Sequence, residues 1–311
     1  MSIIDLLSIS NCSDFEGEPL LMKRIVSVFC CLVLLFCASA ASARVYFEQE
    51  PPADWKDRDV LKWTIFDVDE GDAMLLECGG ESMLVDGGPN PFREKLRDAL
   101  EKRGLKNSMK YILSTHYHDD HIDGIFRLFE FGFTPGEYLH SYNEWAIQSE
   151  ELLARAVKAA QKNNVPIRRV QDGDTLTLGG ADIRIFQCTT IKGTNARSLM
   201  LKVTYGESTL LLCADIIGKT QRYFLDTLGA EVLNSDLIKL PHHAITPAVP
   251  EFLDAVSADA AVATNVKKQL DNKSVAQLET RPLPALYSGD GTVYAVTDGV
   301  DWYLYQTPGE F

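Results

Sequence analysis

Three of the chain's six histidines lie close together in the stretch 114–124, which is STHYHDDHIDG. The stretch directly follows a predicted buried strand. In an extended chain, side chains two residues apart point the same way, so His116 and His118 can bind one metal ion from the same side. Asp120 and His121, where the chain turns toward a helix, can face a second ion beside the first. Imidazole and carboxylate ligands suit zinc, manganese or iron, so this spacing predicts a metal site and not merely a histidine-rich surface loop.

Further ligands for a two-metal site occur where later apolar runs end. Asp215 follows the apolar residues 210–214, where a carboxylate is costly unless it is paired or binds metal. An alternative role for Asp215 is to cap a helix that begins near Ile217. His242 and His243 follow another apolar run; one can be a ligand while the other supports it, and His242 is slightly favoured as the ligand. The sequence thus predicts two metal ions held at several strand ends.

The elements that must position these residues alternate with turns. Strands are predicted at 61–68, 73–78, 82–85, 111–114, near 138, and at 167–170, 175–178, 183–188, 198–205, 209–213, 237–240 and 260–263. Helices are predicted after an Asn90 cap with Pro91 at the first position, at 122–130, at about 144–161, at 219–228 and after Pro250. Two blocks, each rich in strands at its start, indicate a sandwich of two sheets covered by helices. Since the chain shows no repeat or long linker, residues 44–311 are expected to form one domain.

The first 43 residues carry the features of an upstream extension followed by a signal peptide. Met22 is followed by a basic pair, by an apolar run at 25–37 and by small residues at 38–43 that offer A-x-A cleavage sites. The apolar run is short for a membrane span, although a membrane anchor or a buried strand is the alternative. We expect translation to start at Met22 and the mature protein to be exported, periplasmic or extracellular, with no stable membrane span after cleavage.

Charge and cysteine content narrow the possible partners. The formal net charge is -14, and removing residues 1–43, with two basic and four acidic side chains, would change it to -12. An acidic surface gives no electrostatic attraction for nucleic acid, but it does not exclude a small anionic substrate. Cys78, Cys188 and Cys213 remain, widely spaced and odd in number. They predict neither a disulfide framework nor a cysteine zinc site, and each is expected to be a core residue. The oligomeric state is not indicated.

At this point the chain resembles the metallo-β-lactamase superfamily and, more narrowly, stand-alone relatives of the ComEC competence-protein hydrolase domain. The resemblance rests on DVDEGDA at 67–73, LVDGG at 84–88, the histidine motif, the loop 195–199, the pair 214–215, HHAI at 242–245 and a terminal hairpin at 291–302. It implies an α/β (α+β) fold, the four-layer αββα sandwich, with the metals at strand ends between the sheets. It also implies that Asp215 is shared by both metals and that Asp86 supports a histidine of the motif, whereas a turn before Gly87 and Gly88 is the alternative role for Asp86.

One departure from the family pattern concerns the first metal ion. Many superfamily hydrolases have another metal-binding histidine before the shared aspartate, but the only intervening histidine here is His140, far from the relevant loop. Asn195 stands in that loop, as in the ComEC-like group, so the first ion is expected to be held more weakly. Lys192 and Arg197 flank Asn195 and could bind a substrate anion; the alternative is that they are simply solvated loop residues.

These features predict a hydrolase of the EC 3 class with two divalent ions, zinc or manganese. Metal-bound hydroxide would attack a phosphoryl or acyl centre, with Asp120 orienting the water and Asp215 bridging the ions. A phosphodiester is the leading substrate by resemblance, although Asp69-Glu70 and Ala244-Ile245 replace the family's Gly-Gln and Gly-Ser and weaken the case for nuclease activity. The alternatives are a β-lactam, a lactone or another small-molecule acyl substrate, or a metal-binding module without turnover. No G-x-S-x-G elbow or P-loop supports another chemistry.

Overall fold

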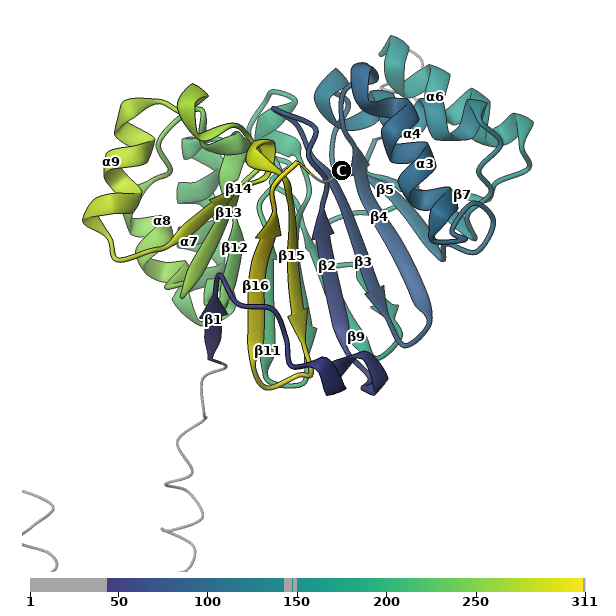
Figure 1. The fold of residues 1–311 in the computed structure, drawn as a ribbon. Helices are drawn as coiled ribbons and strands as arrows, with labels where there is room; N and C mark the ends of the chain where they lie inside the picture. The colour runs from purple at the N-terminus through teal and green to yellow at the C-terminus, as the bar shows by residue number, and fades with distance from the viewer. Residues whose placement is uncertain (1–43, 143–146, 148–149, 310) are drawn as a thin grey trace, which may run out of the picture. The chain divides into compact units, whose positions relative to one another are not determined.

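Two β-sheets lie face to face in the computed structural model, which describes residues 44–142, 147, 150–309 and 311 (Figure 1). In order across the first sheet, the strands are β1 (Val45–Phe47), β16 (Trp302–Thr307), β15 (Thr292–Thr297), β2 (Leu61–Ile65), β3 (Ala73–Cys78), β4 (Glu81–Gly87), β5 (Tyr111–Ser114), β6 (Glu137–His140) and β7 (Ile167–Arg169). The second sheet has β14 (Ala285–Tyr287), β13 (Ala260–Ala263), β12 (Leu237–Lys239), β11 (Ser208–Leu212), β10 (Met200–Tyr205), β9 (Ala181–Phe186) and β8 (Thr175–Leu178).

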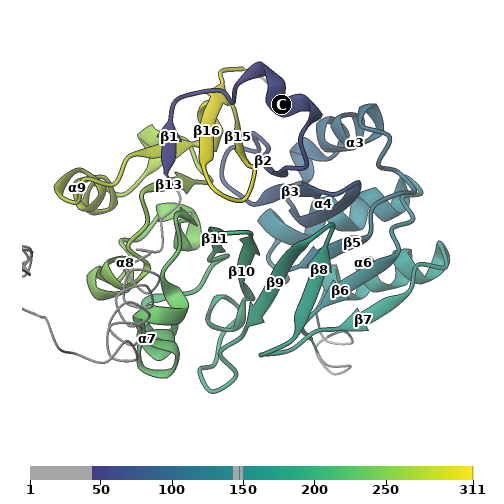
Figure 2. The same ribbon diagram turned by 90° about the horizontal axis from the view of Figure 1, so that it is seen from below.

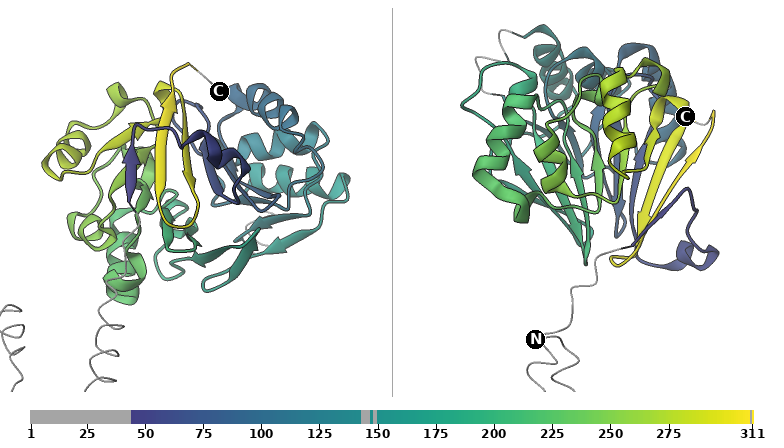
Figure 3. Two further views of the ribbon diagram at one scale, coloured as in Figure 1. Left: turned by 60° about the horizontal axis from the view of Figure 1, so that its bottom comes forward. Right: turned by 90° about the vertical axis from the view of Figure 1, so that its left-hand side faces the viewer.

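Helices cover the outer face of each sheet. The first sheet carries α3 (Arg93–Lys102), α4 (Asp119–Glu130) and α6 (Glu151–Lys162); the second carries α7 (Gly218–Leu233), α8 (Pro250–Val256) and α9 (Asn272–Thr280). Seen from below, the two groups of helices lie on opposite sides of the paired sheets (Figure 2), and two further views show the same arrangement (Figure 3). The predicted sandwich of two helix-covered sheets is therefore confirmed, and it matches the four-layer metallo-β-lactamase fold.

The core between the sheets follows from the alternation of apolar and polar residues. In β9 the burial pattern alternates along ADIRI, so Ile183 and Ile185 enter the core while Asp182 and Arg184 stay exposed. Ile183 and Ile185 belong to the same buried cluster as Trp63 of the opposite sheet, which is fully buried. In contrast, every residue of β12 and β13 is buried, as expected for central parallel strands covered on both faces.

Parallel pairing explains why the predicted site residues meet. Strands β4, β5, β6 and β7 pair in parallel, and so do β11, β12, β13 and β14. The carboxyl ends of parallel strands lie at the same edge of a sheet, and this is where ligands bind in α/β folds. The loops after β4, β5, β11, β12 and β13 therefore converge at one end of the sandwich.

Several predicted elements differ from the observed ones. Asn90 does not cap a helix: a short 3-10 turn, Asn90–Phe92, precedes α3, and the Asn90 side-chain oxygen instead accepts hydrogen bonds from Arg93 and Arg127, both at 3.1 Å. Helix α9 and the strands β1 and β14 were not predicted, because they are short and weakly periodic. The predicted end of a helix near Leu228 coincides with Gly229, a non-helical residue with φ 69° inside α7.

Other predictions concern parts of the chain that are not described. The extension and signal peptide at 1–43, and the start of the helix expected from about residue 144, lie outside the described residues; α6 itself begins at Glu151. In the part of the chain that is described, no helix combines the length and the apolar character needed to cross a membrane. The three cysteines of this part, Cys78, Cys188 and Cys213, are free and buried, as expected.

Candidate metal centre

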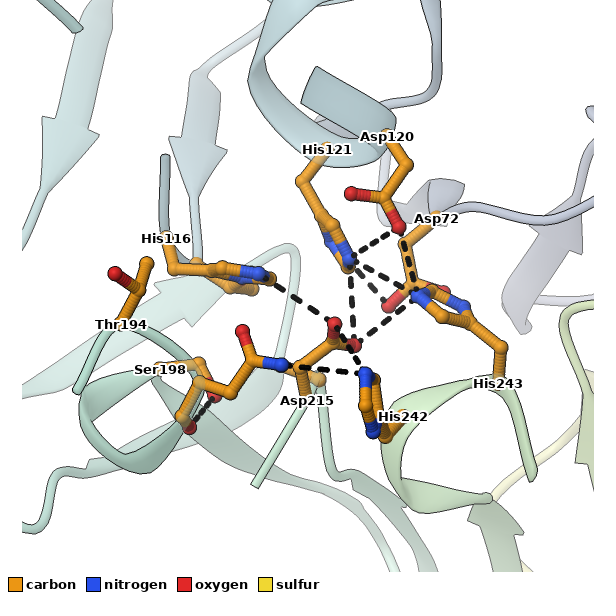
Figure 4. A network of polar contacts seen from close by, with 12 residues as sticks. Asp72, His116, Asp120, His121, Thr194, Ser198, Asp215, His242 and His243 are labelled. Atoms are coloured by element: carbon orange, nitrogen blue, oxygen red, sulfur yellow. Dashed lines mark hydrogen bonds and ion pairs between the residues drawn. The ribbon is translucent and has the colours of Figure 1, made fainter. Parts of the chain in front are cut away.

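Four donor atoms from α4 and from the loops after β11 and β12 lie close together (Figure 4). They are Nε2 of His121, Nε2 of His243, Oδ2 of Asp120 and Oδ1 of Asp215, and we call these four residues the inner cage. The separations are 3.1 Å for His243–Asp120, 3.2 Å for His243–Asp215 and His121–His243, 3.3 Å for His121–Asp215 and 3.5 Å for His121–Asp120. These separations form two triangles, each made of both histidine nitrogens and one carboxylate oxygen, whose three atoms are close enough to bind one metal ion. His121, Asp215 and His243 also form a group with Asp72, in which the ligand atoms all lie within 4.8 Å of one another.

A second set of ligands lies beside the inner cage. His116, His118 and Asp215 can each offer one ligand atom within 4.8 Å of the others, and we call them the outer cage. His116 Nε2 is 3.5 Å from Oδ2 of Asp215, whereas Oδ1 of the same carboxylate faces the inner cage. Figure 4 shows Asp215 between His116 on one side and His121 and His243 on the other. The two oxygens of Asp215 are therefore arranged as a ligand shared by two ions would require.

The Nδ1 atoms of three histidines are held by partners that leave Nε2 available. His121 Nδ1 lies 2.9 Å from Oδ2 of Asp86, and His243 Nδ1 lies 2.8 Å from the hydroxyl of Thr264. His116 Nδ1 lies 3.0 Å from the Thr115 hydroxyl, which in turn donates to Asp86 at 2.6 Å. When Nδ1 donates a proton to such a partner, Nε2 carries the free lone pair that a metal needs. All three histidines are thus oriented as metal ligands.

The two late histidines face different sets. His243 is buried and belongs to the inner cage, whereas the sequence favoured His242 as the ligand. His242 Nε2 is 3.9 Å from Oδ2 of Asp215, on the side of the outer cage, and 3.2 Å from Nδ2 of Asn195. The geometry therefore places His243 at the site of the second ion, in the inner cage, and places His242 and Asn195 beside the site of the first ion, in the outer cage.

The backbone at these strand ends is strained. Five non-glycine residues here have positive φ: Asp86 at 57°, Ala214 at 43°, His242 at 50°, His243 at 52° and Ala244 at 58°. Each such conformation costs about 1–3 kcal/mol and persists only where the surroundings enforce it. Ala244 stands where the resembled family has glycine, which would adopt this conformation at less cost. Strain concentrated at ligand positions is typical of a functional site.

Close packing of α4 against β4 sets the position of the histidine motif. A Cβ atom on Gly124 would collide with the carbonyl oxygen of Gly87, and Gly124 N donates to Gly88 O at 3.0 Å. Because glycine occupies both positions, the second turn of α4 can lie directly on the end of β4. This contact places His121 against Asp86.

Burial and charge strongly perturb the titration of the cluster. Burial, together with the charge on His121, lowers the pKa of His116 to about 4. Burial would also lower the pKa of His121 and His243, but the carboxylate of Asp215 raises that of His121 well above its usual value and that of His243 to about 10. Burial would raise the pKa of Asp120, but the hydrogen bond from His243 and the charge on His121 lower it to about 2. Without metal, protons on the inner-cage histidines thus balance the carboxylates, and a metal ion would replace them.

The structure places the other residues with predicted roles, Asp86, Asp215, Lys192 and Arg197, in different surroundings. Asp86 is fully buried and lies 2.9 Å from Nδ1 of His121, and it belongs to strand β4 although its φ is positive. Asp215 does not cap a helix, because the N-cap of α7 is Ile217. Lys192 and Arg197 are exposed, and the Arg197 guanidinium donates to backbone carbonyls of its own loop at 3.1 and 3.3 Å. Arg197 thus holds the loop together.

Four buried residues of the site were not singled out from the sequence: Asp72, Thr115, Lys239 and Thr264. Asp72 and Thr115 lie inside the motifs that carry the family resemblance, but neither looks like a ligand by spacing. Lys239 could have been found, since a lysine is rarely fully buried unless paired, and it stands in an apolar run. Thr264 follows a buried strand, where a hydroxyl carries no distinctive signal.

The residues present fit divalent metal ions. His116 Nε2 and Asp215 Oδ1 are buried and have no hydrogen-bond partner among the described residues, although each points toward other ligand atoms. A buried polar atom without a partner is costly, and a metal ion would satisfy both. The fold and the cluster together indicate a protein of the two-sheet sandwich class with a site for divalent metal ions.

The chain belongs to the metallo-beta-lactamase superfamily, whose family model matches residues 66–273. The chain is similar to the metallo-beta-lactamase fold protein YhfI from Bacillus subtilis, at 16% identity over 74% of this chain and 96% of that one, with a TM-score of 0.49. It is also similar to a diphosphatase from the PhnP family (16% identity, 76% and 98% coverage, TM-score 0.47) and to the diiron β-hydroxylase CmlA from Streptomyces venezuelae (14% identity, 76% and 53% coverage, TM-score 0.47). No curated protein sequence matches.

Proposed function

We propose that this protein is a metal-dependent hydrolase with two divalent ions, zinc or manganese, one in each cage. The observation that carries the proposal is the inner cage, where Nε2 of His121 and Nε2 of His243 lie 3.2 Å apart and each lies 3.1–3.5 Å from one oxygen of Asp120 and one oxygen of Asp215. His116, His118 and the other oxygen of Asp215, which form the outer cage, would hold the other ion. Membership of the superfamily supports this proposal.

Ions held there would lower the pKa of a bound water to about 7 and polarise the bond to be cleaved. The chain's own residues would position these groups. Asp120 is the most exposed side chain of the inner cage, with 26% of its side chain accessible, so its carboxylate can accept a hydrogen bond from a water molecule and orient it. Asp86 and Thr115 hold the rings of His121 and His116 from behind. No nucleophilic side chain is required.

A phosphodiester or related phosphoryl compound is our proposed substrate class, supported by the resemblance to the ComEC-like group. The loop that carries Lys192, Asn195 and Arg197 lies beside the outer cage through Asn195, so its basic residues could attract an anionic group. The net charge of -14 argues against a long nucleic acid. We further propose export, supported by the sequence features of residues 1–43.

The test is an activity panel on the purified protein, with zinc or manganese supplied, against a phosphodiester, a β-lactam and a lactone. His243→Gln removes an inner-cage ligand, and His140→Gln is its matched control, because His140 is equally buried but belongs to neither cage. We expect phosphodiester hydrolysis that His243→Gln abolishes and His140→Gln retains. Hydrolysis of the β-lactam or lactone alone would replace our substrate class by the acyl alternative. Metal binding without turnover of any compound would support the non-catalytic alternative.

A further inference from the structure

A lysine is buried in the centre of the sandwich, behind the metal cluster. Lys239 is the last residue of β12, and none of its side chain is accessible to solvent. Its Nζ atom lies 2.6 Å from Oδ2 of Asp72, which stands just before β3 in the opposite sheet and is equally buried. Charged side chains are almost never fully buried unless they are paired, and a buried pair is weak evidence for stability alone. Lys239 therefore requires an explanation beyond the fold.

The same ammonium group reaches the turn that aims Asp215. Lys239 Nζ donates to the carbonyl oxygen of Ala214 at 3.0 Å and is 3.9 Å from Oδ1 of Asp215. The Ala214 oxygen also accepts the backbone N–H of His242 at 2.9 Å. One carbonyl group thus ties together the lysine, the residue before the shared carboxylate and the first residue of the histidine pair.

Both segments that meet at this carbonyl group are strained. Ala214 and His242 to Ala244 have positive φ, a conformation that the surroundings must enforce. Lys239 supplies a charged donor to the carbonyl group at the centre of these segments, and such bonds are about twice as strong as neutral ones.

Asp72 connects Lys239 to ligand residues and to the end of β4 in the other sheet. Oδ1 of Asp72 is 3.4 Å from Nδ1 of His243, on the side of the ring away from the cage. Its backbone N–H donates to the carbonyl oxygen of Asp120 at 3.2 Å, and its own carbonyl oxygen accepts Gly88 N at 2.8 Å. Since Oδ2 is bonded to Lys239 and Oδ1 faces Nδ1, Asp72 supports the ligands instead of joining the cage.

We propose that Lys239 is a positioning residue: by binding the Ala214 carbonyl group and Asp72 together, it fixes Asp215 and the His242–His243 turn in the geometry that accepts two metal ions. The assignment of the ions rests on the proposed function, but the positioning itself is a property of the metal-free protein. The competing explanation is that Lys239 only neutralises Asp72. That explanation predicts that removing both charges together restores the site.

The first experiment measures hydrogen–deuterium exchange in the metal-free protein. In Lys239→Met, which keeps the length of the side chain, we expect the His242 amide and its neighbours to exchange at least tenfold faster. Lys202→Met is the matched control, because Lys202 is a lysine of the same sheet that donates to two backbone carbonyls, of Val232 at 2.8 Å and Asn234 at 2.7 Å, which precede β12, whereas Lys239 ends that strand. Lys202→Met should leave exchange at 242–245 unchanged. Unchanged exchange in Lys239→Met would overturn the proposal.

The second experiment distinguishes positioning by Lys239 from neutralisation of Asp72. It also gives a result if the single variant Lys239→Met folds poorly. In Lys239→Met/Asp72→Asn the unpaired buried carboxylate is absent, so folding should recover, but exchange at 242–245 should stay fast. Titration with zinc alone should show that both variants lose at least tenfold in affinity relative to the wild type and to Lys202→Met. Wild-type exchange and affinity in the double variant would show that Lys239 only balances charge. If the wild type itself binds no zinc or manganese, the proposed function fails, while the exchange experiment still decides the role of Lys239.

Discussion

The hydrogen bonds behind the histidines predict different consequences for two neighbouring substitutions. Asp86 accepts the Nδ1 proton of His121 directly, at 2.9 Å, and supports His116 only through the Thr115 hydroxyl. Asp86→Asn keeps the size of the side chain, but its amide group can present a donor to His121 Nδ1. The proton of His121 would then move to Nε2, which removes the lone pair that faces the inner cage. Asp86→Asn should therefore weaken the binding of both ions, whereas Thr115→Val should mainly weaken the binding of the ion in the outer cage.

The expected loss of metal affinity follows from the contribution that groups behind metal-binding histidines make in other metal sites. Loss of a partner behind a metal-binding histidine costs about 10–100-fold in metal affinity, which corresponds to about 1.4–2.7 kcal/mol. For Asp86→Asn we expect a loss in this range at both sites, because two histidines depend on one carboxylate. For Thr115→Val we expect about tenfold at the outer site and less than threefold at the inner one, because Asp86 keeps its bonds to His121 and to the Thr115 backbone N–H, the latter at 2.8 Å.

The assay is a cobalt titration of the metal-free protein, followed by visible absorption and by competition with a chelator of known affinity. Circular dichroism verifies that each variant is folded, and the ¹⁵N chemical shifts of the histidine rings report which nitrogen carries the proton. Asp86 does not orient the two histidines if Asp86→Asn binds both ions within threefold of the wild type. Thr115 does not act through His116 if Thr115→Val weakens the inner site more than the outer one.

Three further predictions follow from single positions. Asn195→His should tighten the weaker of two steps in a metal titration and leave the stronger step unchanged, because imidazole is a better donor than an amide; two equal steps in the wild type would contradict this. Gly124→Ala should destabilise the fold by at least about 3 kcal/mol in urea unfolding, since its Cβ collides with the Gly87 carbonyl group, whereas the control Gly218→Ala should change stability by no more than about 1 kcal/mol. Burial and a nearby arginine lower the pKa of His140 to about 4 in the folded protein, so the unfolded chain takes up a proton first as the pH falls below about 6.5. Between pH 7.5 and 4.5 the metal-free wild type should therefore lose about 2–3 kcal/mol more free energy of unfolding than His140→Gln. Equal losses in the two proteins would show that buried, neutral His140 does not contribute to acid unfolding.

The sequence predicted much of the architecture because the strands repeat a strong alternation or a strong apolar run. Strands such as Tyr111–Ser114, Thr175–Leu178 and Ala260–Ala263 have the predicted bounds. Helix α9 and strand β14 were missed, because burial of α9 is limited to Ser274 and Leu278 and its pattern is weak. Short elements are positioned by tertiary contacts, which local periodicity does not record.

The ligand positions could be predicted from the sequence, whereas supporting partners from across the sandwich could not. Histidine and aspartate at strand ends are chemically distinctive, so His116, His121 and Asp215 could be named without coordinates. The choice between His242 and His243 could not be made, because it depends on two successive left-handed residues that turn the second ring into the cage. Partners across the sandwich, such as Lys239, depend on which strand ends face each other, and that is set by the packing of the two sheets.

Exposure divides the candidate site into a part that holds metal and a part that meets substrate. His121, His243 and Asp215 are almost fully buried, whereas the side chains of Asp120 and His242 are 26% and 22% accessible. Solvent therefore reaches the inner cage at Asp120 and the outer cage at His242, and the loop of Asn195 lies beside His242. The buried ligands stand at strand ends fixed by the two sheets, so they determine which ions bind and which class of reaction is possible. The neighbouring loop is tied to the motif by the bond from the Thr194 hydroxyl to the Tyr117 hydroxyl, at 3.0 Å, and of its residues Asn195 also contacts His242. Substitution of the exposed residues Lys192 and Arg197 should consequently change substrate preference while the metal content stays the same.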